Sequence, residues 1–82
     1  MDLTVYPGLP FMLDEKDVGR SFRVAVGGNA YAVVQIKRLD DRRVLMHCPQ
    51  LDRSYELRHY PEPFVGWLTG GDKVGNAQLT QV

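Results

Sequence analysis

Apolar and polar residues alternate along four consecutive stretches in the middle of the chain. Even positions are apolar in residues 20–26, 30–38 and 42–48, although Tyr31 and Val33 make the other face of the second stretch partly apolar, and in residues 53–60 the apolar positions are odd. A period of two, rich in β-branched and aromatic residues, is typical of strands with one buried face. We therefore expect four antiparallel strands whose inward side chains are Phe22, Val24, Val26, Ala32, Val34, Ile36, Val44, Met46, Cys48, Tyr55 and Leu57.

The segments between these strands predict their register. A three-residue loop over 27–29, rich in glycine, pairs Val26 with Ala30 and, further along, Phe22 with Val34. The same even face then continues through the whole of the first hairpin. A slip of one residue would move every side chain of a strand to the other face.

The next two turns agree with that buried face. A three-residue loop or bulge around Asp40 and Asp41 sets even positions against even positions, and a four-residue loop over 49–52 sets Met46 opposite Tyr55. Three successive hairpins therefore predict one shared core.

The flanks carry weaker patterns. Residues 3–6 suit a short strand, and residues 9–18 suit one helical turn with Phe11 and Leu13 packed on the core. The apolar run at 64–68 predicts a short fifth strand. Residues 69–82 form either a frayed tail or an edge strand paired with residues 3–6.

Length and composition bound the architecture. The 82 residues suit a single domain over 1–82 with its core in 18–68, and 44% hydrophobic with 24% charged residues is ordinary for a globular chain. The expected fold is all-β: a small SH3-like barrel or a strongly bent antiparallel meander of about five strands with one short helical turn.

Charge and apolar runs limit the function classes. Ten basic residues balance ten acidic ones, which removes the broad electrostatic attraction to nucleic acid or membranes. The apolar runs are far shorter than the ~20 residues of a membrane span, and the N-terminus lacks a basic and apolar leader. With a single cysteine as well, we expect a cytoplasmic protein with no membrane contact.

No group of residues has the pattern of a catalytic or metal site. His47 and Cys48 are neighbours in a strand and point to opposite faces, so they cannot bind one metal. Cys48 lies on the predicted core face, where a free cysteine acts as a small hydrophobe. The acidic pairs, such as Asp40-Asp41, lie in turns. We expect no enzyme activity and no cofactor.

Arginines and tyrosines form the candidate binding surface. Neighbouring arginines without counter-ions would gain from an anionic or acidic partner, and arginine and tyrosine are enriched at interface hot spots. The alternative is an ordinary solvated surface in which Glu56, Asp40 and Asp41 neutralise the arginines. The candidate partner-binding residues are Arg38, Arg42, Arg43, Arg58, Tyr31, Tyr60, Asp40 and Asp41.

The step Asp17-Val18-Gly19-Arg20 into a strand resembles the opening of SH3-like small barrels of the Tudor and KOW kind, and of small phage and prophage proteins. The resemblance covers residues 14–68 and implies the barrel fold. Tudor domains that read methylated side chains carry an aromatic cage, and the aromatic residues of this chain do not align with one.

Three functions remain open at this point. The first is a non-catalytic protein that binds a host protein or complex, such as a phage-encoded inhibitor of a host defence or transcription component. The second is a nucleic-acid-binding module that uses an arginine-rich sheet face, which the neutral net charge disfavours. The third is a tetrameric enzyme, because residues 34–36 are similar to a strand of plasmid-type dihydrofolate reductases. A homodimer, either through the patch of exposed tyrosines and Arg58 or through an open edge strand, is a further alternative.

Overall fold

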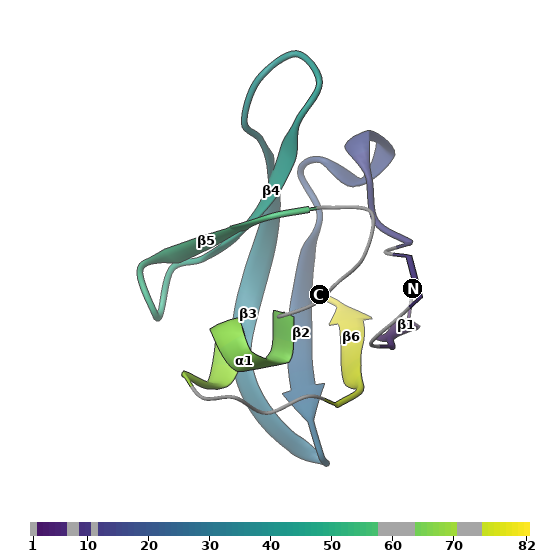
Figure 1. Cartoon of the computed structure of the whole chain (residues 1–82), viewed down its shortest axis with the longest axis vertical. Helices are drawn as coiled ribbons and strands as arrows, with labels where there is room; N and C mark the ends of the chain where they lie inside the picture. Colours follow the sequence, from purple (N-terminus) through teal and green to yellow (C-terminus); the bar gives the residue numbers. More distant parts are fainter. Residues whose placement is uncertain (1, 7–8, 11, 58–63, 71–74) are drawn as a thin grey trace.

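The computed structural model describes residues 2–6, 9–10, 12–57, 64–70 and 75–82, and within them six strands form one antiparallel sheet (Figure 1). The strand order is β1-β6-β2-β3-β4-β5, and β1 and β5 do not pair, so the sheet is open. The all-β class is confirmed. The elements are β1 (Asp2–Val5), the 3₁₀ turn η1 (Glu15–Asp17), β2 (Ser21–Val26), β3 (Asn29–Arg38), β4 (Val44–Cys48), β5 (Arg53–Glu56), the helix α1 (Phe64–Thr69) and β6 (Ala77–Gln81).

The predicted inward face forms the core. Every position predicted to point inward is buried, except Val26 and Leu57, which are half-buried and pack against the core. The helical turn expected in residues 9–18 is η1, and Leu13 before it is buried, whereas Phe11 lies outside the described residues. The core also receives Val5, Phe64, Val65, Leu68, Ala77 and Leu79 from the flanks.

The hairpin of β2 and β3 differs from the prediction at its turn. Val26 pairs with Asn29 and not with Ala30, because Gly27 and Gly28 adopt φ of 59° and 83° and make a two-residue turn. A register shift beside Val24 then takes up one extra residue of β3. The shift restores the predicted pairing of Phe22 with Val34 further along.

The next two hairpins keep the predicted buried face, and the second of them also has the predicted register. Ile36 pairs with Met46, and Met46 pairs with Tyr55, so even positions of β3 and β4 and odd positions of β5 share the core face. The β3–β4 loop is longer than expected, because β4 begins at Val44. The last described residue of the predicted fourth strand is Leu57, whose backbone N–H donates to the Val44 carbonyl over 2.9 Å.

The C-terminal strand lies inside the sheet. β6 pairs with β1, as the edge-strand alternative expected, but it also pairs with β2 along its other side. The predicted edge position of this strand was therefore wrong, because β6 lies between β1 and β2 and β1 is the outer strand. The reason is that β6 alternates buried Ala77 and Leu79 with exposed Gln78 and Thr80, and so completes the core face between its two neighbours.

The fifth strand expected over 64–68 was also wrong, because these residues form the helix α1. Phe64, Val65 and Leu68 are all buried. Val65 and Leu68 follow Phe64 by one and four positions, a spacing that places the three side chains on one face of a helix. Gly70, with φ of 75°, donates its N–H to the Gly66 carbonyl and ends the helix. In the view of Figure 1, α1 lies in front of β2 and β3.

Candidate interaction surface

The loop between β3 and β4, residues 39–43, stands at one end of the longest axis of the molecule (Figure 1). The Asp40 carboxylate organises it. One oxygen accepts the backbone N–H groups of Arg42 and Arg43 at 2.9 Å each, and the other accepts the Arg43 Nε–H at 2.6 Å. The Leu39 N–H donates to the Arg43 carbonyl at 2.9 Å and closes the loop at its base. A single side chain thus holds an exposed loop in one conformation.

These hydrogen bonds also affect the pKa values of two groups in the loop, the Asp40 carboxyl and the Arg43 guanidinium. The backbone N–H of Arg42, with the Arg43 side chain, lowers the pKa of the Asp40 carboxyl. The hydrogen bond to Asp40 in turn raises the pKa of Arg43. Both groups therefore carry their charges at neutral pH.

Two of the candidate arginines have carboxylate partners. Arg43 contacts Asp40 and lies 3.9 Å from Glu56, and Arg38 pairs with Glu15 at 2.7 Å. The counter-ions Asp40 and Glu56 were expected as the alternative to a binding surface, whereas Glu15 was missed. The charged run at 14–17 was its only signal in the sequence.

The remaining loop side chains face solvent. In the described part of the chain, no ion pair or side-chain hydrogen bond involves Asp41 or the Arg42 guanidinium, and Leu39 is 43% exposed. Residues 40–43 line a hollow of about 550 Å³. The loop presents one apolar side chain, one acid and one free cation on a fixed backbone.

The other candidate residues do not join this loop. Tyr31 is 42% exposed, but it lies near the start of β3, at the end of the strand opposite to Arg38. Seven residues separate the two along one strand, which is roughly 23 Å. Arg58 and Tyr60 lie outside the described residues. The structure therefore brings together residues 38–43 and separates Tyr31 from them.

The Asp17-Val18-Gly19-Arg20 step has a structural role. The Asp17 carboxylate is buried, accepts the Asp14 N–H at 3.1 Å and lies 3.4 Å from Arg20 Nε. Gly19, with φ of 94°, donates its N–H to the Ile36 carbonyl at 2.9 Å. These contacts join η1 to the entry of β2 and to β3.

The His47 and Cys48 side chains lie on opposite faces, as predicted. Cys48 is fully buried, while His47 Nδ1 lies 3.0 Å from Ser54 Oγ across the outer face of the sheet. Among the described residues, no group of three or more histidine, cysteine or acidic side chains is placed to hold a metal ion.

Comparison of the chain with protein-family models, curated proteins and solved structures gave no match. In the described residues, no helix has the length and apolar character needed to cross a membrane.

Proposed function

We propose that this chain is a non-catalytic binding protein that contacts a protein partner through the β3–β4 loop, residues 39–43. The observation that carries the proposal is the Asp40 network. A loop already held in its bound shape loses less conformational entropy on binding, so its few exposed groups contribute more of their interaction energy to affinity.

The side chains of the loop indicate the kind of surface it fits. Leu39 suits a small apolar pocket, and Arg42 suits a neighbouring carboxylate. Asp41 beside Arg42 makes the tip mixed in charge. Protein surfaces typically carry both positive and negative groups, so a protein can complement this mixture of charges.

The same charges disfavour the alternative of a nucleic-acid-binding module. Arg38 and Arg43 are already paired with carboxylates, and Asp40 and Asp41 would repel phosphates. The narrower idea, a phage or prophage inhibitor of a host defence or transcription component, rests on the resemblance of residues 17–20 alone.

Affinity capture with matched charge reversals tests the proposal. Tagged protein is incubated with lysate of the organism that encodes it, with and without nuclease, and retained proteins are quantified by mass spectrometry. Arg42→Glu should lower capture of a discrete protein about tenfold, since it reverses a charge at the contact. Arg23→Glu is the control, because Arg23 is also exposed and lies on β2.

Each other result has a definite meaning. Equal loss with Arg23→Glu would move the contact to the sheet face. Retention that disappears with nuclease would replace the proposal by the nucleic-acid alternative.

A further inference from the structure

The strand β1 is the last strand on its side of the sheet. One side of its backbone pairs with β6, and its other side pairs with no strand of the described chain. Free edge strands template pairing with another chain, and monomeric proteins block them with lysine, proline or a bulge. Residues 2–5 contain no lysine or proline, and their pairing with β6 shows no register shift.

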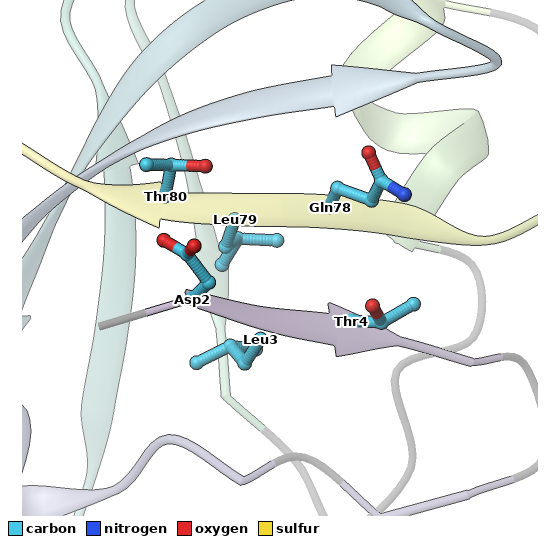
Figure 2. Close-up of a pocket in the computed structure, with 6 residues that line it drawn as sticks. All are labelled: Asp2, Leu3, Thr4, Gln78, Leu79 and Thr80. Carbon is cyan, nitrogen blue, oxygen red and sulfur yellow. The ribbon is translucent and has the colours of Figure 1, made fainter.

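The outer face beside this edge is open. Figure 2 shows Asp2 and Thr4 of β1 with Gln78 and Thr80 of β6, the residues that pair directly across the two strands. Together with Leu3 and Leu79 they line a hollow of about 370 Å³. On this face Asp2, Gln78 and Thr80 are exposed, and Thr4 is half-buried.

The edge is complementary to itself. In a two-fold antiparallel pair, opposite residues share a face, so their numbers must sum to an even value. A pair centred on Thr4 places Thr4 opposite Thr4, Leu3 opposite Val5, and Asp2 opposite Tyr6. The first pair joins two hydroxyl side chains, the second joins two apolar side chains, and the third joins a carboxylate acceptor with a phenol donor. Cross-strand pairs of these kinds stabilise sheets.

Other centres fit less well. Centring on Asp2 sets two carboxylates against each other, and centring on Val5 brings Pro7, which has no N–H, into the ladder. Centring on Leu3 leaves Tyr6 outside the pair, although Tyr6 is 45% exposed. Only the Thr4-centred register uses residues 2–6 in full and covers that ring.

We propose that β1 pairs antiparallel with β1 of a second copy of this chain, centred on Thr4, to form a continuous twelve-stranded sheet. The net charge of zero supports a second copy as the occupant, because two copies do not repel each other. Five residues a side make a small interface, so the dimer forms at high concentration. This contact is separate from the β3–β4 loop.

Disulfide trapping tests the register. Opposite residues in an antiparallel pair have Cα atoms about 4.5–5.5 Å apart, within disulfide range. Thr4→Cys should therefore cross-link to a covalent dimer under mild oxidation. Gln78→Cys is the control, because Gln78 pairs with Thr4 on the interior strand β6 and is also exposed. The native Cys48 is fully buried and does not compete.

Sedimentation equilibrium of the unmodified chain, up to about 1 mM, provides a second measurement. We expect a reversible dimer that Thr4→Lys weakens about tenfold or more, because two cations then lie opposite each other. Arg42→Glu should leave the dimer unchanged, which separates this proposal from the proposed function. Equal cross-linking of both cysteine variants would overturn it. A chain that stays monomeric at every concentration would overturn it in favour of an extended segment of another protein.

Discussion

Two aspartates order this chain at the scale of single residues, and both do so by accepting backbone N–H groups. Asp17 is 1% exposed and joins η1 to β2 through Asp14 and Arg20. Asp40 is exposed and shapes the β3–β4 loop. Burial makes the first aspartate important for stability, whereas the second controls the conformation of a surface loop.

Asp17→Ala should lower the free energy of unfolding by about 2 kcal/mol, because it leaves a backbone N–H without its acceptor and removes one of the partners of Arg20. Urea denaturation measures the change. Asp17→Asn keeps one acceptor oxygen and should cost less. Asp41→Ala, in an exposed loop, should stay within about 0.5 kcal/mol. Equal losses for Asp17→Ala and Asp41→Ala would contradict the role of Asp17.

Asp40 should titrate below its ordinary pKa of 3.8, because the Arg42 N–H and the Arg43 side chain stabilise its ionised form. A lowered pKa in the folded chain means that the stabilisation is complete above the unfolded pKa, taken as the same 3.8, and is lost as the pH falls through the folded pKa. Carboxyl NMR shifts measure the midpoint, and the Arg42 and Arg43 amides should follow it. Asp40→Asn should abolish that amide titration. A midpoint at or above 3.8 would contradict the network.

At the scale of elements, α1 is held by aromatic contacts with the sheet. The Phe64 ring lies 5.7 Å from Tyr55 on β5 and 5.8 Å from Trp67, and Trp67 lies 5.4 Å from Tyr55. Arg53 donates to the Trp67 carbonyl at 3.2 Å. A six-residue helix is unstable alone, so these tertiary contacts stabilise it.

Phe64→Ala should cost about 3–5 kcal/mol, because it empties the centre of this aromatic group. Urea unfolding followed by Trp67 fluorescence reports the loss directly, since Trp67 is the single tryptophan. Phe64→Leu should retain much of the stability. A cost below about 1 kcal/mol for Phe64→Ala would show that α1 does not dock on the sheet.

At the scale of the whole molecule, positive and negative charges are equal in number, and several of them lie in direct contact with an opposite charge. Ten basic residues meet ten acidic ones, and Arg38 and Arg43 each contact a carboxylate. A surface of this kind has no extended field for a polyanion, whereas it suits short-range contact with a protein.

The chain should therefore elute from heparin at or below about 0.15 M NaCl, because few cations are free to displace counter-ions from a polyanion. Salt-gradient chromatography makes the measurement, and Asp40→Asn with Asp41→Asn, which removes two acids from the loop, should elute later. Strong retention of the unmodified chain that falls steeply with salt would favour the nucleic-acid alternative.

The four central strands and their buried face follow from the amino-acid sequence alone. Alternation with a period of two is a local signal, and burial penalises a slip of one residue. The pattern therefore predicts that even positions of β3 face even positions of β4, and that Met46 pairs with Tyr55. The acidic pair also predicts a turn around Asp40, whereas the pairing of Arg43 with Asp40 and Glu56 was one of two alternatives that the sequence left open. The ~23 Å between Tyr31 and Arg38 could have been deduced from the predicted strand as well.

Long-range contacts decide the helix α1, the interior position of β6 and the edge position of β1. The run at 64–68 is too short for its periodicity to separate a helix from a strand, and contacts with Tyr55 decide between them. The position of β6 depends on pairing with β2, more than fifty residues away in the sequence. Such pairings depend on which surfaces come into contact once the chain is compact, and local sequence patterns do not predict these long-range contacts.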